Sequence, residues 1–395
     1  MQAEDFTLHR MIAAVMIALT AEQEMIVSSL EKLAEQEFSE KAFSWEGELP
    51  IENIELLAER GFLGLNISEE YGGGGMGEFE AMLSIEAVGQ VCPDTAEYLY
   101  NQQMVAPRAI EMFGTDEIKE RYLSGVTTGD ERIAIAISEP EAGSDVGAMR
   151  TRVDKQSGGL VLNGEKVWVS NIPYASAVVV WATFPEGYGS VVIDLEDNDD
   201  NVEIEQHYTN MAGHTQTQFR MHDVQIPESH VLTRGKTGFK QQLQALNWER
   251  LGSATLSNAI ARCALAKALE YSQQREQFGQ PIADFQGIEW KLADMVKRME
   301  ASRALTYRAA INAEEHDRIP DRLDASLAKL YSGEMVEEVV SESLQIHGAN
   351  GYQQGHALEY LHRLARGRRL AAGTDEIQKN QIAAALKRHG LPPLA

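Results

Sequence analysis

Hydrophobic and polar residues follow two different periods along the chain, and the period changes twice. Apolar residues recur at helical spacing in segments 22–38, 51–65, 79–91 and 106–125. From 131 to 235, β-branched clusters and alternating stretches are separated by Gly, Asn and Pro, which predicts short strands. The helical period then returns in 238–275, 284–315, 321–347 and 374–389. The pattern predicts a multi-domain α+β fold: a helical domain at 17–130, a central antiparallel β-barrel or sandwich at 131–235, and a four-helix bundle at 236–395.

The N-terminal stretch before the first helix is short and apolar. The run 11–19 is too short to cross a bilayer and is followed by no small-residue cleavage site, so neither a membrane anchor nor a signal peptide is expected. Translation beginning at Met11 or Met16 is the simpler expectation. Thr20 and Gln23 are spaced as a capping box, which predicts that the first helix begins there.

The segment 246–279 contains no proline and is expected to form one long buried helix. Helical spacing places Glu249 on the same side as Leu246, Ser253, Leu256 and Ile260, where a solvated glutamate is not expected. Periodicity alone leaves two interpretations open. Glu249 either pairs with an arginine or faces water at the first turn, or it is a functional carboxylate.

Composition excludes several classes of protein. The formal net charge of -25 and pI near 4.8 argue against nucleic-acid binding, because no basic excess is present to neutralise phosphates. Cys92 and Cys263 lie far apart among apolar residues, so we expect no disulfide and a reducing, cytoplasmic environment. No zinc-type cluster or nucleophile elbow is present in the sequence, and we expect no metal. The glycine run 71–77 follows no strand, which favours a flexible helix connection over a phosphate loop.

Five short motifs occur in a fixed order. They are SEPEAGSD at 138–145, NGEKVWVSN at 163–171, REQFGQPIADFQ at 275–286, QIHGANGY at 345–352 and AGTDEIQ at 372–378. Together with the helix–strand–helix order, they make the chain from about Leu19 to Arg388 resemble the acyl-CoA dehydrogenase family. The resemblance implies an FAD-dependent α,β-dehydrogenation of an acyl-CoA thioester, with electrons passed to an electron-transfer flavoprotein.

The resemblance also implies where FAD binds. A flavin ring needs polar groups at its edge and an apolar or aromatic surface against one face, which Ser138, Ser144, Trp168 and Ser170 supply. Without the motif, Trp168 would be interpreted as a core residue of an alternating strand. In the family the adenosine and pyrophosphate end reaches an adjacent subunit, so a homotetramer, a dimer of dimers, is expected. The matching residues here are Arg275, Phe278, Gln286, Gln345, Gly348 and Ala349, with Thr374 and Glu376 as further FAD contacts.

The catalytic base departs from the family's usual pattern. Most members place a glutamate directly before the Gly-Thr of the last motif, and this chain has Ala372 there. The isovaleryl-CoA and long-chain types resemble this chain, because they carry the base in a Glu-Arg pair on the long helix, matched by Glu249 and Arg250. The backbone N–H of Ala372 remains able to bind the substrate oxygen. The expected substrate contacts are Ser144, Asn247, Arg250, Ala372 and Gly373.

Other departures leave alternatives open. Leu364 replaces an acid, Ala212 a commonly basic residue and Ala349 a glycine. The arginines at 363–369 are expected to face solvent, a CoA phosphate or a neighbouring subunit. His214, His347 and His356 are expected to be structural or surface residues. The favoured function is dehydrogenation of a short, medium or branched acyl-CoA. The alternatives are reduction of an enoyl-CoA, other CoA-thioester chemistry, or a flavin-binding assembly protein that has lost catalysis.

Overall fold

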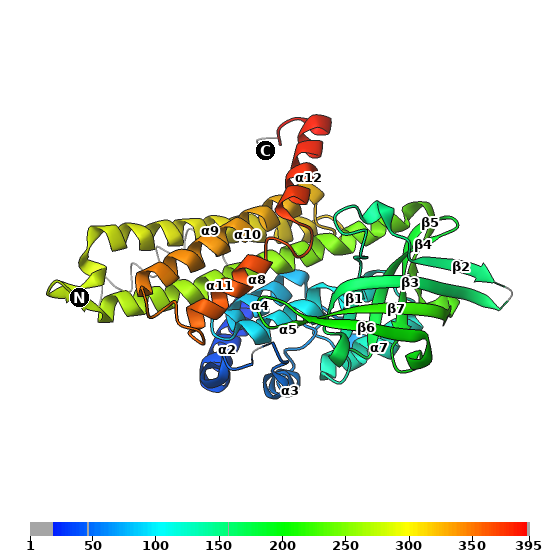
Figure 1. Cartoon of the computed structure of the whole chain (residues 1–395), viewed down its shortest axis with the longest axis horizontal. Coiled ribbons are helices and arrows are strands. Elements are labelled where there is room, and N and C mark those ends of the chain that lie inside the picture. The colour runs from blue at the N-terminus through cyan, green and yellow to red at the C-terminus, as the bar shows by residue number, and fades with distance from the viewer. Residues whose placement is uncertain (1–18, 46, 157, 393–395) are drawn as a thin grey trace.

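The computed structural model describes residues 19–45, 47–156 and 158–392. In Figure 1 a sheet forms one end of an elongated molecule, the C-terminal helices extend to the other end, and the N-terminal helices lie beside the middle. The apolar run 11–19, apart from Leu19, lies outside the described residues, as do Met11 and Met16. None of the described helices is long and apolar enough to cross a membrane.

The N-terminal third folds into helices, as the sequence predicts. The capping box is confirmed: the N–H of Gln23 donates to Thr20 Oγ1 (3.2 Å), and the N–H of Thr20 donates to Gln23 Oε1 (2.9 Å). One helix that the sequence did not mark separately, α5, is almost entirely buried. The helices are α2 (Ala21–Leu33), α3 (Ile51–Glu59), α4 (Glu78–Gly89), α5 (Pro93–Met104), α6 (Ala106–Phe113) and α7 (Asp116–Thr128).

The glycine run between α3 and α4 is not the flexible connection that we expected. Its backbone N–H groups donate to the segment 64–68, for example from Gly75 to Ile67 O (2.8 Å) and from Met76 to Leu65 O (2.9 Å). A Cβ at Gly73 would lie 2.2 Å from Ile67 O. The glycines therefore permit two backbone segments to pack directly against each other.

The central domain is one sheet of eight strands in the order β6-β7-β3-β2-β4-β5-β8, with β1 paired to β4. Most neighbours are antiparallel, but β1 runs parallel to β4, and β2 meets β4 in parallel at Arg152 and Thr183. The strands are β1 (Ile133–Ala136), β2 (Arg152–Gln156), β3 (Gly159–Ser170), β4 (Ala177–Phe184), β5 (Gly187–Asp194), β6 (Val202–Thr209), β7 (Thr215–Ile226) and β8 (Val231–Thr233).

The expected closed antiparallel barrel is therefore wrong in detail. In the described residues the edge strands β6 and β8 do not pair with each other. The physical reason is that β4 is buried on both faces. Val178 and Val180 pack into the core of the sheet, whereas Ala177 and Val179 pack against α6 and α7. Because helices cover the second face, the sheet does not need to close on itself.

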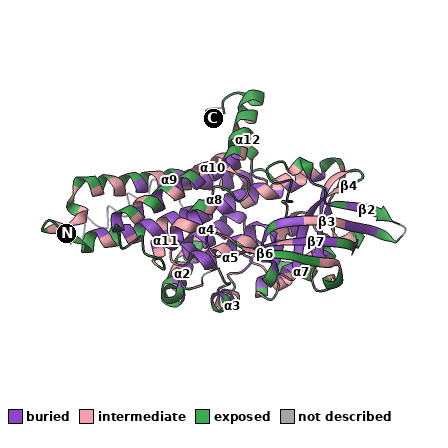
Figure 2. Ribbon diagram, in the orientation of Figure 1, coloured by how far each residue is buried: buried purple, intermediate pink, exposed green. Residues whose placement is uncertain are grey.

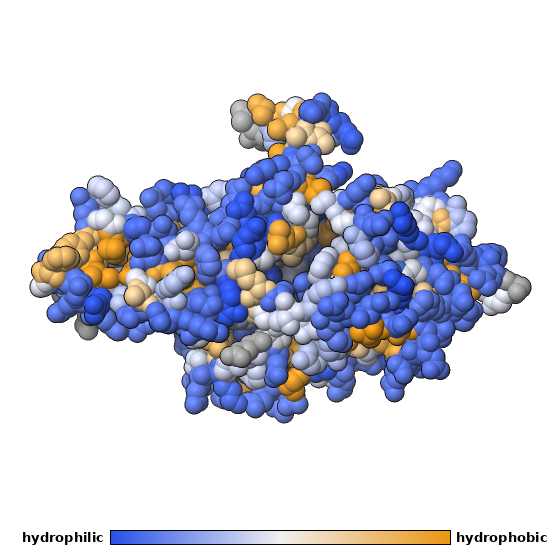
Figure 3. Space-filling model, viewed as in Figure 1, coloured by the Kyte–Doolittle hydropathy of each residue, from blue (hydrophilic) through white to orange (hydrophobic). Residues whose placement is uncertain are grey.

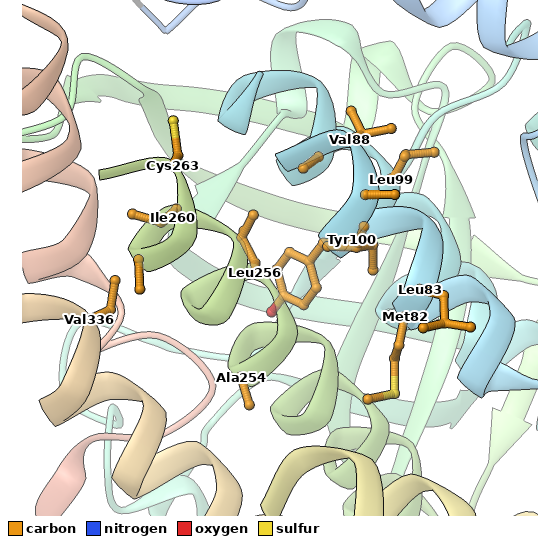
Figure 4. Packing of buried hydrophobic residues seen from close by; sticks show 14 of the residues in the cluster. Met82, Leu83, Val88, Leu99, Tyr100, Ala254, Leu256, Ile260, Cys263 and Val336 are labelled. Carbon is orange, nitrogen blue, oxygen red and sulfur yellow. The ribbon is translucent and has the colours of Figure 1, made fainter. Parts of the chain in front are cut away.

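The long helix is confirmed as α8 (Gly238–Gln274), and it crosses the centre of the molecule. Small residues let α8 approach its neighbours closely. A Cβ at Gly252 would lie 2.7 Å from the ring of Tyr100 in α5. Figure 4 shows Tyr100 beside Leu256 where α5 and α8 meet, with Val336 on the opposite side of α8. Burial of this contiguous core supplies the main driving force for docking α8.

The described part of the C-terminal region contains five helices, where the sequence predicted four. They are α8, α9 (Gln286–Glu314), α10 (Arg322–His347), α11 (Ala357–Gly367) and α12 (Asp375–His389). The missed helix α11 buries Leu358, Leu361 and Leu364. Its arginines and the three preceding glycines concealed the helical pattern. Figure 2 shows α9 and α12 largely exposed, and α12 projects away from the other helices. A short hairpin, β9 (Glu276–Gln277) and β10 (Gln280–Pro281), joins α8 to α9.

Candidate active site

Glu249 lies on the wall of a cavity between the three parts of the chain. No hydrogen bond or ion pair to its carboxylate is found within the described residues, so the expected alternative of an arginine partner does not apply. The cavity walls are largely apolar and offer the carboxylate few polar partners, so it remains available to a ligand. The lining residues are Val105, Ala109, Phe113, Ile135, Trp181, Ser190, Gln242, Ala245, Leu246 and Glu249.

The surroundings of Glu249 set its protonation. Burial among protein atoms raises the pKa of this carboxyl to about 7, and the neighbouring Arg250 lowers it only in part. A carboxylate with this pKa exchanges protons near neutral pH, whereas an ordinary surface glutamate does not. The geometry and the pKa together suit a general base.

Arg250 supports the last motif rather than pairing with Glu249. Its side chain is 3% exposed, and its Nε donates to the carbonyl of Ala372 at 3.3 Å. Its Nη1 donates to Asn247 Oδ1 (2.9 Å), and Asn247 Nδ2 donates to Pro320 O (3.2 Å). Both polar groups of the Asn247 side chain are therefore engaged inside the protein. Burial lowers the pKa of Arg250 to about 10, so the guanidinium stays charged at neutral pH.

The backbone at Ala372 has an unusual conformation. Its φ is +56°, in the left-handed region that residues with a side chain seldom adopt, and Gly373 follows with φ +91°. No hydrogen bond of the described chain uses the N–H of Ala372. A strained turn with a free N–H near Arg250 is suited to binding an oxygen of a ligand.

Trp168 is not a core residue of a regular strand. It is 54% exposed with φ +61°, at a β-bulge where the pairing of β3 with β7 shifts between Lys166 and Val169. Its ring lies 4.9 Å from that of Tyr208. The bulge turns the indole outward, and Ser170 next to it is also exposed. An outward-facing indole beside hydroxyl groups fits one face and edge of a flavin ring.

A buried ion pair that the sequence analysis missed fixes the loop with Ser138 and Ser144 against β3. Lys166, which is fully buried, donates to Glu139 Oε1 (2.9 Å) and Ile137 O (2.9 Å). Glu139 also accepts from the N–H of Thr151 (2.9 Å), and the N–H of Val167 donates to Ser138 O (3.0 Å). Burial lowers the pKa of Lys166 to about 8, with Glu139 opposing the shift. Ser144 is exposed and Ser138 half-buried on this loop.

The residues expected to bind the far end of FAD lie at the other end of α8. Arg275 lies about 39 Å from Glu249 along the helix axis. At this distance one FAD molecule cannot contact Arg275 and the site of Glu249 in the same chain. Phe278 is 95% exposed, and its ring lies 6.1 Å from Phe285. Figure 3 shows apolar residues on the surface at this end. Gln286, Gln345, Gly348 and Ala349 are also exposed.

The last motif opens α12. Thr374 caps this helix by accepting from the N–H of Ile377 (3.4 Å), and Glu376 is exposed in its first turn. Helix N-terminal N–H groups suit phosphate oxygens. No group of side chains suited to a metal ion is found in the described part of the chain.

The arginines at 363–369 pair with carboxylates of the chain, and of the four only Arg366 is exposed to solvent as expected. Arg363 pairs with Glu359, and Arg366 with Glu337. The other two are Arg368, which pairs with Glu97 (3.2 Å), and Arg369, which pairs with Glu337 and Asp375. Glu359 lies on α11 itself, four residues before Arg363, whereas Glu97, Glu337 and Asp375 come from α5, α10 and α12, and spacing in the sequence could not reveal these three.

A second cleft, beside Ser170, holds a polar cluster that was also missed. His214, expected to be structural or at the surface, lies 3.7 Å from Asp94 and 3.9 Å from Glu97, and its Nε2 lies 3.2 Å from Tyr360 Oη. Burial opposes protonation of His214, but the two carboxylates outweigh it and raise the pKa. The cluster joins all three parts of the chain close to the flavin-binding candidate Ser170.

The chain combines a helical domain, a sheet and a helical bundle, with a carboxylate-bearing cavity where the three meet. Sequence models of the acyl-CoA dehydrogenase N-terminal, middle and C-terminal domains match residues 20–130, 134–224 and 236–387. The chain belongs to the acyl-CoA dehydrogenase family.

Known proteins of similar sequence cover nearly the whole chain. The probable acyl-CoA dehydrogenase YngJ of Bacillus subtilis (strain 168) is 33% identical over 92% of this chain and 98% of its own. An acryloyl-CoA reductase (NADH) of Anaerotignum propionicum is 34% identical over 93% and 94%. The solved butyryl-CoA dehydrogenase from Megasphaera elsdenii superposes with a TM-score of 0.88 at 28% identity, covering 95% of this chain and 100% of that one.

Proposed function

We propose that this chain is an FAD-dependent enzyme that oxidises a short, medium or branched acyl-CoA between Cα and Cβ, with Glu249 as the base. One observation carries the proposal: Glu249 has a pKa of about 7, lines a cavity and has no partner in the described chain. A carboxylate in this state costs stability, and proton abstraction from a ligand in the cavity gives it a role that offsets this cost.

The chain's own residues divide the remaining work. FAD, when bound, supplies the acceptor for the β-hydrogen, which leaves as hydride. Glu249 takes the α-proton, and the N–H of Ala372 donates to the thioester oxygen as negative charge develops there. Arg250 holds Ala372 through its carbonyl, while Trp168, Ser138, Ser144 and Ser170 provide the face and edge contacts of the ring.

The cofactor site is proposed to be shared between subunits. Arg275, Phe278, Gln286, Gln345, Gly348 and Ala349 lie at the far end of the helices and serve a neighbour's FAD, with Thr374 and Glu376 as additional contacts. The chain therefore acts as a homotetramer and passes electrons to an electron-transfer flavoprotein. The distance between the two groups along α8 supports this arrangement.

The same residues serve the reverse reaction, in which Glu249 returns a proton to Cα. The similarity to an acryloyl-CoA reductase favours this as the second candidate. Anaerobic mixing separates the two directions. Bleaching of the oxidised flavin by butyryl-CoA supports dehydrogenation, whereas reoxidation of the reduced flavin by crotonyl-CoA with no bleaching by saturated thioesters supports reduction.

The decisive test is Glu249→Gln. The variant is expected to retain FAD but to lose bleaching by acyl-CoA by about 10³-fold or more, because no base remains. Glu270→Gln, an exposed glutamate on the same helix, is the matched control and should behave as the parent. Flavin reduction at the parental rate in Glu249→Gln would refute the assignment of the base. A yellow parent protein that no thioester bleaches would indicate the flavin-binding assembly protein instead.

A further inference from the structure

Gln242 occupies a position where the first turns of α8 touch the sheet. A Cβ at Gly238 would lie 2.0 Å from Tyr188 O, and a Cβ at Gly189 would lie 2.1 Å from Thr233 O. Gly238 is therefore required for α8 to approach β5 this closely, and Gly189 is required for β5 to approach β8. The approach brings Gln242, one turn after Gly238, directly over the backbone of β5.

The orientation of the Gln242 amide follows from its partner. Its Nε2 donates to the carbonyl of Gly189, and a carbonyl can only accept, so the amino group must face β5. The oxygen Oε1 points elsewhere. The residue is 3% exposed, and Oε1 is buried without a hydrogen-bond partner among the described residues. A buried acceptor that has lost water and gained no donor is destabilising, and such an atom calls for an explanation.

Gln242 lines the same cavity as Glu249, two helical turns earlier on α8. The separation along the axis is about 10.5 Å. The other neutral polar side chains on the cavity wall are Trp181, whose indole N–H can only donate, and Ser190, whose hydroxyl is already 3.0 Å from Thr233 Oγ1. Gln242 Oε1 is thus the uncharged acceptor without a partner in the described chain that this wall offers beside the Glu249 carboxylate.

The proposed substrate carries a donor at this distance. The pantetheine arm of CoA contains two amide N–H groups, and the outer one is nine bonds from the α-carbon of the acyl group. An extended chain advances about 3.3–3.6 Å for every three bonds, which places the outer N–H about 10–11 Å from the α-carbon. An acyl-CoA with its α-carbon at Glu249 and its arm along α8 therefore brings this N–H to Gln242.

We propose that Gln242 Oε1 accepts a hydrogen bond from the outer amide N–H of the pantetheine arm and so sets the position of the thioester relative to Glu249. The inference rests on the proposed function, because it takes an acyl-CoA as the ligand. Gln242 is a positioning residue on this assignment and takes no part in proton transfer.

Binding of two thioesters to the purified, FAD-loaded protein tests the proposal. Butyryl-pantetheine contains both amides, whereas butyryl-N-acetylcysteamine contains only the inner one. Calorimetric titration of Gln242→Met should show about 3- to 10-fold weaker binding of butyryl-pantetheine and unchanged binding of butyryl-N-acetylcysteamine. Gln241→Met, at a neighbouring residue outside the cavity lining, should bind both ligands as the parent does.

A change on the ligand side keeps the test valid if Gln242→Met does not fold. Replacing the outer amide by an ester removes the N–H, and binding to the parent should weaken by the same 3- to 10-fold. Unchanged binding of the ester, or an equal loss for both thioesters in Gln242→Met, would overturn the proposal and place any donor on the acyl group. Flavin bleaching is recorded separately. Selective binding without bleaching would remove the proposed reaction and leave the assignment of Gln242 intact.

Discussion

Glu249 illustrates what a sequence can and cannot predict about a single residue. Helical spacing placed the carboxylate on the buried side of a long helix, and the resemblance suggested its role. The absence of a partner depends on where Arg250 points, and that direction is set by the carbonyl of Ala372, far away in the sequence. Spacing therefore predicted the position of Glu249. The absence of a partner, which lets burial raise its pKa to about 7, follows only from the folded structure.

The pKa of Glu249 predicts the pH dependence of the reaction. Dehydrogenation needs the ionised carboxylate, so kcat/KM should rise with pH and level off above an apparent pKa near 7. Anaerobic flavin reduction by butyryl-CoA from about pH 5.5 to 8.5 measures this profile. A rate that is constant or falls over this range would be inconsistent with Glu249 as the base.

The same pKa predicts how Glu249 affects folding. Its folded value of about 7 exceeds the unfolded value of 4.5, so the folded state binds more protons between these limits. The carboxyl group therefore contributes stability below about pH 4.5 that is lost as pH rises through about 7. Replacement by Gln should stabilise the protein at pH 8 relative to pH 5, by at most about 3 kcal/mol. Thermal unfolding of parent and variant at both pH values measures the difference, and an equal shift at both would contradict it.

Strand β3 and the preceding loop form one unit through the buried pair of Glu139 and Lys166. The motif predicted that Ser138 and Trp168 act together, but no pattern in the sequence indicated a lysine inside the sheet. The bulge at Trp168 was equally hidden, because a two-residue alternation cannot show where one extra residue enters a strand. Local pattern predicts elements, whereas irregularities within them depend on neighbouring strands.

Removing the lysine should disrupt this unit. Lys166→Met leaves the Glu139 carboxylate 7% exposed without its cation, which costs about 3–5 kcal/mol and should release FAD. Thermal unfolding and flavin content measure both effects. Arg150→Met is the control, because Arg150 and Glu141 are 80% and 72% exposed and such a pair contributes about 0–1 kcal/mol. The double variant Glu139→Gln/Lys166→Met should recover much of the loss, and a loss equal to that of Lys166→Met would contradict this account.

Across the whole molecule, α8 separates two groups of candidate cofactor residues. Three regions and their order were predicted from the change of period, and the bounds of α8, α9, α10 and α12 were predicted to within two residues. The parallel pairing of β1 with β4 was not predicted, because the direction in which β1 enters the sheet depends on where α7 ends in the folded structure. The internal partners of the arginines at 363–369 were missed for the same reason.

A shared cofactor site predicts complementation between defective subunits. Arg275→Met and Trp168→Ala should each bind several-fold less FAD, although Trp168 lies in strand β3 and Arg275 at the far end of α8. Coexpressed together, the two variants should form assemblies in which some sites combine the intact halves, and FAD content should rise above that of either variant alone. Flavin absorbance of the purified assemblies measures this. The double variant in one chain, which cannot form an intact site, is the control. No gain on coexpression would contradict a site built from two subunits.

The left-handed turn at Ala372 bears on how the position of the catalytic carboxylate could change in evolution. Arg250, next to Glu249 in the chain, donates to the carbonyl of Ala372, and on the proposed mechanism a carboxylate at either position would serve the same α-hydrogen. On that mechanism, an exchange of one arrangement for the other requires an intermediate with two acids or with none. Two nearby acids repel each other and shift both pKa values, whereas a site with no acid lacks a base. Placing glutamate at 372 beside Glu249 would create the intermediate with two acids, and its activity would show whether that route is open.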